Sequence, residues 1–402
     1  MSNPLITYLA IMLAMAITSH VLAAKVPYLR DLVDPYRSRN QALDAFRGLL
    51  ATGVFVHHAA IHLVFLRTHD WDSPSSPFLA FLGEGSVAFF FMISGFLFWA
   101  KSLDRPSTAT GLWINRFWRI MPLYWFAAAC FLVAAFSVSG FQLRESPAML
   151  LSEIVRWTLG GIGGAPHFNG ISPMTIHSVT WTLRFEWVFY FALPLLAIVL
   201  KSRRRFIVAV FVYLAILAVV PFSPLSRLMH PLSLGVYFLC GMAAAYLERI
   251  QIVRIRLRSR QFALLSAAWL VGGLVLFEWL NRTSHAFYFF PIFLAVTCGN
   301  DVLGLLSAKW IVLLGHLSYS IYLLHSLVLF SSLRLLAVFV PTAELSTTAY
   351  WACILLVAAL VVLLSSITYR FIEAPFFPGT RHRDAAPVPF PLPACVKSGS
   401  SA

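Results

Sequence analysis

The chain has 402 residues, of which 59% are hydrophobic and only 11% are charged. Soluble globular proteins carry about 25% charged residues, so this composition excludes a soluble fold and indicates a polytopic membrane protein. A formal net charge of +14 would suggest nucleic-acid binding in a soluble protein, but here the basic residues collect in loops on one predicted side of the membrane. The five cysteines lack CxxC spacing and four lie in apolar runs, which indicates small buried side chains and no metal or disulfide framework.

Eleven apolar segments predict membrane-spanning helices, because most are near the ~20 residues that a helix needs to cross the hydrocarbon core, although the run 286–299 is short. They lie at about 4–24, 43–66, 78–100, 117–139, 179–200, 206–221, 231–249, 262–280, 286–299, 312–338 and 348–371. The first has no basic flank before it and no A-x-A site after it, so it predicts an uncleaved span. The predicted fold class is therefore all-α integral membrane, a polytopic helix bundle of about 11 transmembrane helices.

The Lys and Arg residues are distributed unequally between the two sets of alternating loops. One set carries 22 of them and the other carries five. Because cytoplasmic loops carry the excess of basic residues, the first set is predicted to be cytoplasmic. This places the N-terminus outside and the C-terminus in the cytoplasm.

The second predicted span carries ionisable side chains along its length. His58 follows Arg47 by eleven residues, which places it about 16 Å deeper in the membrane by helical rise. Eleven residues are close to three turns, so the two side chains lie on nearly the same face. Ionisable groups inside a span tend to face a bundle interior or a cavity and to mark function. The adjacent His57 leaves open which of the two imidazoles acts.

The third and fourth spans carry two further motifs. Ser94-Gly95 lies in an aromatic-rich helix, where small residues favour close helix packing, and we expect that role for Ser94. Arg116 and Arg119 lie one turn apart at the cytoplasmic end of the next span. Either they anchor this helix at the inner face, or their guanidinium forks recognise phosphate or carboxylate groups.

The long outer loop, about 140–178, contains the Gly/Pro-rich stretch GGIGGAPHFNGISP and predicts a flexible lid or acceptor-side loop. In the span that follows, Glu186 lies roughly 10 Å from the outer end by helical rise. Arg184 is two residues away and therefore faces elsewhere, so Glu186 needs another partner and is a candidate functional carboxylate. His177, at the membrane edge, fits either a functional or an interfacial position.

Polar side chains recur in the last two spans. Ser318, Tyr322 and His325 share one helical face at i, i+4 and i+7, which predicts a lined cavity, although Tyr322 also fits an interfacial position. The last span closes with Arg370 and Glu373 at i and i+3, which predicts a helix cap and an ion pair.

Six sequence blocks occur in the order typical of one known family. They read LDxxRG followed by a histidine, FFxxSGF, RxxRxxPLY, W(S/T)LxxExxFY, SYSxYLxH and FIExP. Over residues 43–376 the chain thereby resembles the acyltransferase family 3 proteins, which are integral membrane O-acyltransferases with ten-span bundles. The resemblance implies a domain at 43–376, an extra N-terminal transmembrane helix and cytoplasmic linker at 1–42, and a disordered cytoplasmic tail at 377–402.

The resemblance also implies the substrates and the location. The donor would be cytoplasmic acetyl-CoA or another acyl-CoA, and the acceptor a hydroxyl of a carbohydrate or of a glycosylated small molecule. The expected location is a bacterial inner membrane, in which the protein is multi-pass and contacts the lipid bilayer, with no nucleic-acid partner and no metal. The oligomeric state is open between a monomer and a homodimer.

Site residues are assigned by position in the resemblance. The catalytic positions fall on His58, Glu186 and Arg47. The donor-binding positions fall on Arg47, Arg116, Arg119, Ser318, Tyr319, Tyr322 and His325. The chain departs from the family pattern at Thr182, where serine is usual, and at Ser326, where an aromatic residue often follows the histidine. It lacks the SGNH hydrolase-like domain that some members carry, so we expect no separate second transfer step.

The expected mechanism uses His58 as a general base, which is worth roughly 10² to 10⁴ in rate, with Glu186 orienting it. The arginines would meet the CoA phosphates and the oxyanion. A ternary complex is simpler than a transient acyl-histidine, but the sequence leaves both open, together with the acceptor, the acyl chain length and the side of the membrane. The competing class is a transporter or flippase for a polar lipid or glycan precursor, because intramembrane ionisable groups also build substrate paths.

Overall fold

The computed structural model describes residues 3–33, 40–104, 108–276 and 282–377. Within these ranges the secondary structure is helical, and the β pairing is confined to an isolated bridge between Phe168 and Ile171. The tail predicted at 377–402 lies outside the described residues, apart from its first residue. The all-α prediction is confirmed.

Nine helices in the described ranges are long and apolar enough to cross a membrane. They are α1 (Pro4–Lys25), α3 (Gln41–Thr68), α4 (Pro77–Asp104), α5 (Ala109–Val138), α8 (Trp181–Leu200), α9 (Arg203–Val219), α10 (Met229–Leu247), α15 (Ser318–Leu336) and α16 (Thr347–Thr368). Two more predicted spans correspond to the shorter helices α12 (Arg260–Leu276) and α13 (Arg282–Thr297). Each of the eleven predicted segments therefore contains a helix.

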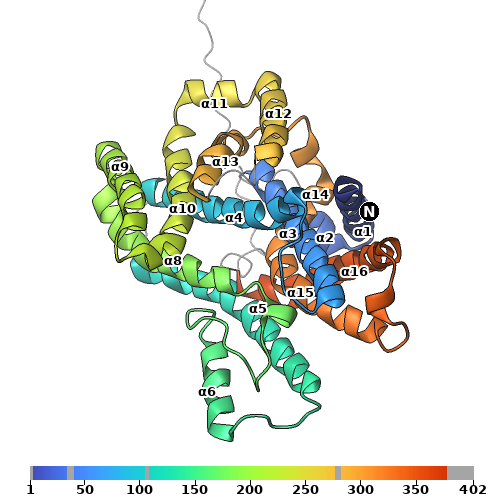
Figure 1. Cartoon of the computed structure of the whole chain (residues 1–402). Coiled ribbons are helices and arrows are strands. Elements are labelled where there is room, and N and C mark those ends of the chain that lie inside the picture. Colours follow the sequence, from blue (N-terminus) through green and yellow to red (C-terminus); the bar gives the residue numbers. More distant parts are fainter. Residues whose placement is uncertain (1–2, 34–39, 105–107, 277–281, 378–402) are drawn as a thin grey trace, which may run out of the picture.

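The remaining α-helices of the described ranges are short connections. They are α2 (Pro27–Leu32), α6 (Pro147–Thr158), α7 (Met174–His177), α11 (Gln251–Leu257) and α14 (Lys309–His316). The segment predicted as one span at 312–338 is divided, because α14 ends at His316 and α15 begins at Ser318. Helix α6 belongs to the long outer loop and projects from the bundle at the bottom of Figure 1.

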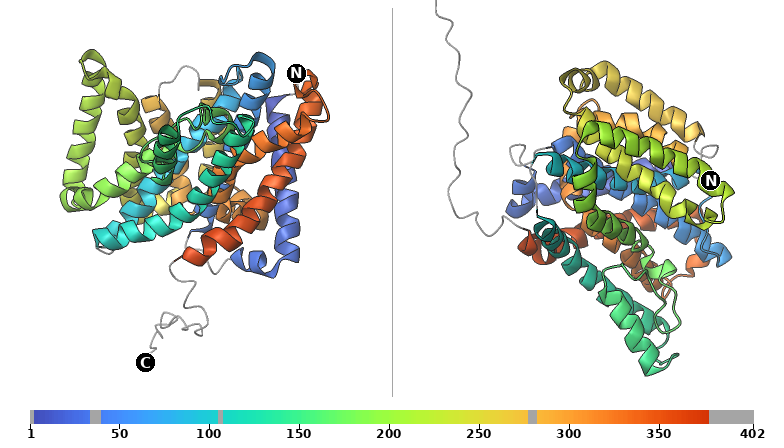
Figure 2. Two further views of the ribbon diagram at one scale, coloured as in Figure 1. Left: turned by 90° about the horizontal axis from the view of Figure 1, so that it is seen from below. Right: turned by 90° about the vertical axis from the view of Figure 1, so that its left-hand side faces the viewer.

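Helix α3 lies in the middle of the bundle, where it contacts α4, α14 and α15. The left view of Figure 2 shows the long helices running obliquely between two faces of the molecule, with α9 at one margin. Large apolar side chains on the outer surfaces are exposed, as for Ile198 of α8 (74%), Phe211 of α9 (69%) and Leu356 of α16 (75%). Such surfaces match the apolar solvent that a membrane provides.

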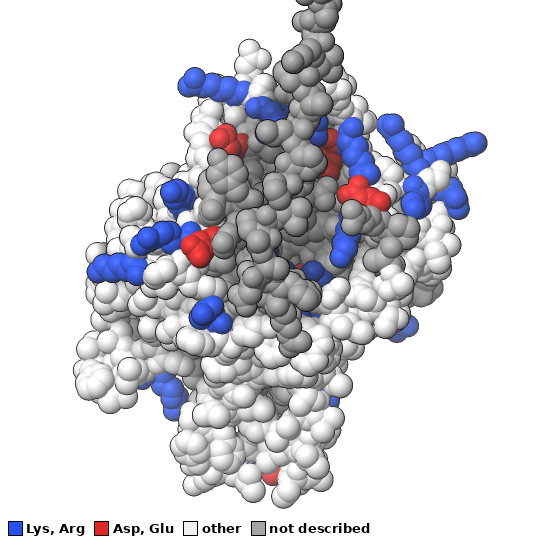
Figure 3. Space-filling view, turned by 180° about the vertical axis from the view of Figure 1, so that it is seen from behind, with Lys and Arg blue, Asp and Glu red and all other residues white. Residues whose placement is uncertain are grey.

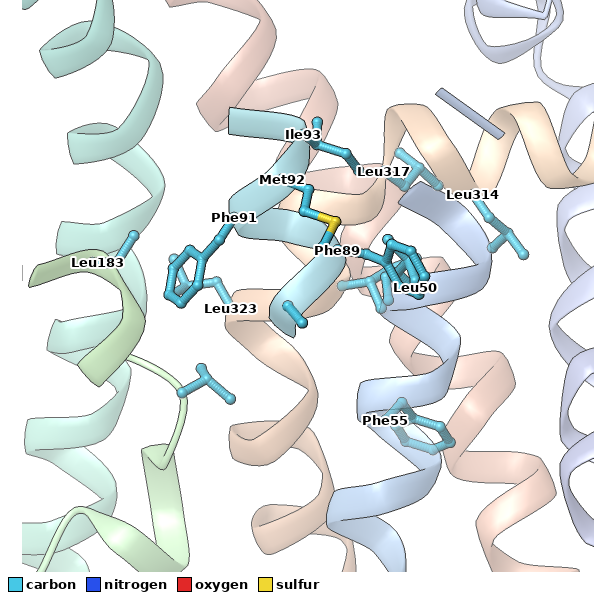
Figure 4. Close-up of a cluster of buried hydrophobic side chains, with 14 of the residues drawn as sticks. Leu50, Phe55, Phe89, Phe91, Met92, Ile93, Leu183, Leu314, Leu317 and Leu323 are labelled. Carbon is cyan, nitrogen blue, oxygen red and sulfur yellow. The ribbon is translucent and has the colours of Figure 1, made fainter. Parts of the chain in front are cut away.

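Buried apolar side chains from α3, α4 and α15 form the core around which the site is built. Figure 4 shows Leu50 and Phe55 of α3, Phe89 and Phe91 of α4, and Leu323 of α15 in this cluster. All five are at most 6% exposed. This packing fixes the lateral positions of the helices that carry the polar side chains described below.

Glycines allow two close helix crossings. A Cβ on Gly315 would fall on the carbonyl oxygen of Asp44, and a Cβ on Gly48 would lie 2.7 Å from the amide nitrogen of Gly315. The same holds where α4 crosses α10, because a Cβ on Gly95 would fall on the carbonyl oxygen of Phe238. Small residues at such crossings let helix backbones approach closely in a membrane.

Candidate active site

A cavity of about 400 Å³ lies between α3, α4, α5, α8 and α15. Three arginines line it, and it is called here the arginine cavity. Its lining includes Arg47, Arg116, Arg119, Glu186, Ser318, Tyr319 and Tyr322, all of which the sequence had singled out. Because α3, α5 and α15 begin near its mouth while α4 ends there, the cavity opens at one end of the bundle.

The three arginines are held by contacts within the bundle. The guanidinium carbon of Arg116 lies 4.3 Å from the ring centroid of Phe98, and that of Arg119 lies 5.0 Å from the ring centroid of Phe377. A guanidinium nitrogen of Arg47 lies 3.9 Å from a carboxylate oxygen of Asp44, one helical turn earlier. Stacking leaves the edges of the guanidinium groups of Arg116 and Arg119 free to donate hydrogen bonds to a ligand. This placement favours the recognition interpretation over simple anchoring.

The carboxylate of Glu186 is held by hydrogen bonds inside the arginine cavity. Its carboxylate accepts hydrogen bonds from the hydroxyl of Tyr190 (2.6 Å) and from the hydroxyl of Ser94 (3.3 Å). Arg184 is exposed and lies over the ring of Phe185, so it faces away as expected. No hydrogen bond between Glu186 and the histidine His58 is found among the described residues. The expected orienting role of Glu186 toward His58 therefore has no support in this geometry.

Ser94 also differs from expectation. It was predicted to serve helix packing, but it lines the arginine cavity and donates to Glu186. The close approach of α4 to α10 occurs at the neighbouring Gly95 instead. Adjacent helix positions point about 100° apart, so the two residues of this pair serve different neighbours.

A second, smaller cavity of about 120 Å³ lies deeper in the bundle. It is lined by His57 and His58 and is called here the histidine cavity; further lining residues are Val54, Gly83, Glu84, Ala88, Val179, Trp181, Leu234 and Tyr237. Val87 and Tyr322 line both this cavity and the arginine cavity. The hydroxyl of Tyr322 is fixed by Thr182 Oγ1 at 2.8 Å. Tyr322 and Val87 therefore form the boundary at which the two cavities meet.

His58 is paired with a second imidazole from α15. The Nδ1 atom of His58 lies 3.1 Å from Nε2 of His325 and 3.0 Å from the carbonyl oxygen of Val54. The Nδ1 atom of His325 lies 3.0 Å from the carbonyl oxygen of Ile321. A carbonyl oxygen only accepts hydrogen bonds, so both rings carry their proton on Nδ1. His58 then donates to Nε2 of His325, and its own Nε2 has a free lone pair.

The neighbouring His57 has a different environment. Its Nδ1 donates to the carbonyl oxygen of Leu79 (2.8 Å), and a Cβ on Gly83 would overlap its ring. Its side chain is buried at 9% exposure, whereas His58 is only half-buried. The pairing with a second imidazole and the greater access favour His58 over His57 as the acting imidazole.

The other predicted residues are placed as follows. Tyr319 donates its hydroxyl to the carbonyl oxygen of Ile120 (2.8 Å). The hydroxyl of Ser318 is buried at the arginine cavity and has no hydrogen-bond partner among the described residues. His325 contacts His58 and is fully buried, and its predicted role in donor binding stays a prediction.

The end of the last span departs from the predicted cap and ion pair. The carboxylate of Glu373 turns into the bundle and accepts a hydrogen bond from Ser320. The guanidinium of Arg370 lies 4.1 Å from the ring centroid of Tyr28. The two side chains separate because α16 passes into a π-helical turn at Tyr369–Glu373, which alters the i, i+3 geometry of an α-helix.

Two tryptophans hold the Gly/Pro-rich stretch of the outer loop, Trp187 from α8 of the bundle and Trp157 from α6 of the same loop. The indole of Trp187 donates to the carbonyl oxygen of Gly160 (3.0 Å), and the indole of Trp157 donates to the carbonyl oxygen of Pro166 (3.2 Å). Gly160 has a φ of +67°, which only glycine adopts without strain. The lid or acceptor-side role of this loop stays a prediction.

Asn169 is the centre of a polar network in the same loop. Its side-chain amide donates to the hydroxyl of Ser139 (2.9 Å) and to the carbonyl oxygen of Gln142 (2.8 Å). Its backbone N–H donates to a carboxyl oxygen of Glu153 on α6 (3.0 Å). Burial raises the pKa of Glu153, and a hydrogen bond with the carboxyl group of Glu145 raises it further.

Sequence reasoning missed several side chains at the two cavities. Tyr190 could have been found, because it lies at i+4 from Glu186 on the same helical face. Glu84 is a carboxylate in an otherwise apolar helix, which is a detectable signal. Trp181 and the His58–His325 pair needed the tertiary structure, because the residues come from helices far apart in sequence. In the described ranges no three His, Cys, Asp or Glu side chains are grouped as a metal site requires.

The fold and these cavities define a multi-pass membrane protein with a polar site inside its helix bundle. Comparison with known families matches residues 40–370 to Acyl_transf_3, the acyltransferase domain. This match covers most of the chain, so the protein belongs to that family, as the sequence blocks predicted. It is a multi-pass membrane acyltransferase.

One curated protein is similar over part of the chain. It is the "Exopolysaccharide production protein ExoZ" of Rhizobium meliloti (strain 1021), which is 29% identical over 109 residues. The aligned part is 27% of this chain and 32% of that protein, so it spans about a third of the relative. No solved structure matches the chain.

Proposed function

We propose that the protein transfers an acyl group, in the first instance acetyl, from cytoplasmic acyl-CoA to a hydroxyl of a carbohydrate. The observation that carries this proposal is the free Nε2 of His58, whose ring pairs with His325 on the wall of the histidine cavity, which meets the arginine cavity at Tyr322 and Val87. A neutral imidazole with one free nitrogen is the usual general base in acyl transfer. The two cavities give the two substrates separate approaches to it.

The reaction follows from the positions of these groups. Nε2 of His58 takes the proton of the acceptor hydroxyl as the hydroxyl oxygen attacks the thioester carbonyl carbon. The tetrahedral oxyanion then collapses, the carbon–sulfur bond breaks, and His58 returns the proton to the CoA thiolate. The transient imidazolium stays hydrogen-bonded through Nδ1 to His325. Tyr322 lines both cavities, and its hydroxyl is hydrogen-bonded to Thr182 (2.8 Å) and to the carbonyl oxygen of Val179 (3.2 Å), so its ring bounds the site without donating to the oxyanion.

The arginine cavity supports an acyl-CoA donor. Its three guanidinium groups provide charge-assisted hydrogen bonds for carbonyl oxygens of the pantetheine arm and of the thioester. Lys and Arg side chains gather on the face of the molecule shown in Figure 3, and Lys101 lies at the mouth of the cavity. Because basic residues mark the cytoplasmic side, we assign the mouth to the cytoplasm, the N-terminus to the outside and the C-terminus to the inside of a bacterial inner membrane.

A carbohydrate acceptor is supported by two observations. The partial relative is named for exopolysaccharide production. In the histidine cavity, an indole face of Trp181 and the carboxylate of Glu84 accompany His58. An aromatic face and a carboxylate acceptor suit the apolar face and the hydroxyls of a sugar.

The direct test is transfer of an acetyl label. Purified protein in detergent receives acetyl-labelled CoA and a panel of glycan acceptors, and thioester loss and labelled product are followed together. We expect product with the native protein, a loss of about 10² to 10⁴ in rate in His58→Ala, and retained activity in the control His20→Ala, whose side chain is exposed far from the site. Full activity in His58→Ala would refute the assigned base, and absence of turnover with every acceptor would favour transport.

A further inference from the structure

A third cavity adjoins the mouth of the arginine cavity. It has a volume of about 1410 Å³ and lies between the start of α3, the end of α4, α11 and the turn after α13. It is called here the vestibule. Asp44, Leu97 and Lys101 line both the vestibule and the arginine cavity, so the two are continuous.

Several basic side chains line the vestibule, and they differ in whether they form an ion pair with a carboxylate. Arg249 is occupied, because it forms an ion pair with Asp104 (2.7 Å). Lys101, Arg254 and Arg258 also line the cavity and are exposed. Among the described residues, no ion pair joins any of these three to a carboxylate. Three such cations around one recess favour an anionic ligand with more than one phosphate.

Carboxylates also line the vestibule, which narrows the ligand class. Asp301 lies on its wall beside the cations, together with Glu248, which already has a partner. An inorganic phosphate would gain nothing from them. A nucleotide, in contrast, offers ribose hydroxyls and an adenine amino group that carboxylates accept, together with phosphates that cations bind.

The volumes of the two cavities also favour a nucleotide in the vestibule. Pockets for small ligands typically occupy about 300–1,000 Å³. The arginine cavity, at about 400 Å³, is at the lower end of this range and cannot hold a whole acyl-CoA. The larger vestibule is the adjoining space.

We propose that the vestibule binds the phosphorylated adenine nucleotide of acyl-CoA through Lys101, Arg254 and Arg258, and that the pantetheine arm passes Lys101 into the arginine cavity. This inference rests on the proposed function. It assigns the CoA phosphates to the vestibule, and it leaves Arg47, Arg116 and Arg119 to the arm and the thioester. No bond is made or broken in this step.

The test compares a donor that has the nucleotide with one that lacks it. Native protein, Arg254→Gln and Arg258→Gln are assayed with acetyl-CoA and with acetyl-pantetheine. The matched control is Arg256→Gln, which changes an exposed arginine of the same helix α11 that does not line the vestibule. We expect kcat/KM for acetyl-CoA to fall about tenfold per arginine removed, with acetyl-pantetheine unaffected and the control unchanged.

A second measurement is independent of turnover. Binding of adenosine 3′,5′-bisphosphate is measured by calorimetry on native protein and on the same variants, and weaker binding in Arg254→Gln and Arg258→Gln supports the inference. Equal binding in all variants, or an equal loss of rate with both donors, would overturn it. If the native protein transfers from neither donor but binds the bisphosphate through these arginines, the proposed function fails and the nucleotide site stands.

Discussion

The pairing of His58 with His325 leads to a prediction about reaction rates. Loss of His325, which orients the base, should lower the rate less than loss of the base His58 itself. In His325→Phe a ring of similar shape fills the fully buried site, but the acceptor for Nδ1–H of His58 is lost. The carbonyl oxygen of Val54, 3.0 Å from the same Nδ1, remains as an acceptor and preserves the tautomer. The free Nε2 should therefore persist while the stabilisation of the imidazolium falls.

The magnitude follows from the charge on His58 during the reaction. Hydrogen bonds to charged groups are worth about 1.5–3 kcal/mol. Their loss in the transition state corresponds to a decrease in kcat of about 10- to 150-fold. Complete removal of the base in His58→Ala should cost about 10² to 10⁴, so the His325 variant should retain more activity.

The assay is steady-state transfer from acetyl-CoA, with kcat and KM measured separately. We expect KM for acetyl-CoA to stay near the native value, because His325 lines neither the arginine cavity nor the vestibule. The matched variant His325→Gln supplies an amide oxygen that accepts the Nδ1–H bond, and it should recover part of kcat. Thermal unfolding in detergent checks that both variants are folded.

Two results would refute the reasoning. Native kcat in a folded His325→Phe would show that the imidazole pair has no part in the reaction. A decrease confined to KM would show that His325 acts on donor binding, as the sequence alone had predicted.

Three further predictions concern the bundle, the arginine cavity and the outer loop. In Gly315→Val the new side chain meets the carbonyl oxygen of Asp44. We therefore expect the free energy of unfolding to fall by more than about 3 kcal/mol, with little monodisperse protein in size-exclusion chromatography. A native yield and a native melting temperature would contradict this. Tyr190→Phe removes the 2.6 Å hydrogen bond to Glu186. We expect a several-fold higher KM for acetyl-CoA and an unchanged melting temperature. An unchanged KM would show that Glu186 has no part in donor binding. Burial raises the pKa of Glu153, so protonation favours the folded loop and its contribution to stability is lost as pH rises through the folded-state pKa. Glu153→Gln should therefore resist proteolysis of the loop better than native protein above the folded-state pKa, and this difference should disappear as the pH is lowered; a difference that does not change with pH would be the contrary result.

The sequence by itself determined the helices and the residues that carry the chemistry. Runs of apolar residues near the length of a membrane crossing predict spans without reference to any neighbour, and each predicted span contains a helix. Helical periodicity also placed Ser318 and Tyr322 on one face, and both line the arginine cavity. The order of the six sequence blocks identified the family.

Only the tertiary structure decided which of these side chains meet. Periodicity gives the face of a helix but not the helix it turns toward, because apolar surfaces pack against many neighbours with similar energy in a membrane. Thus Glu186 was assigned to His58 but binds Tyr190 and Ser94, while the partner of His58 is His325, 267 residues further along the chain. The vestibule likewise comes from helix ends and turns remote in sequence, whose approach depends on the packing of the whole bundle.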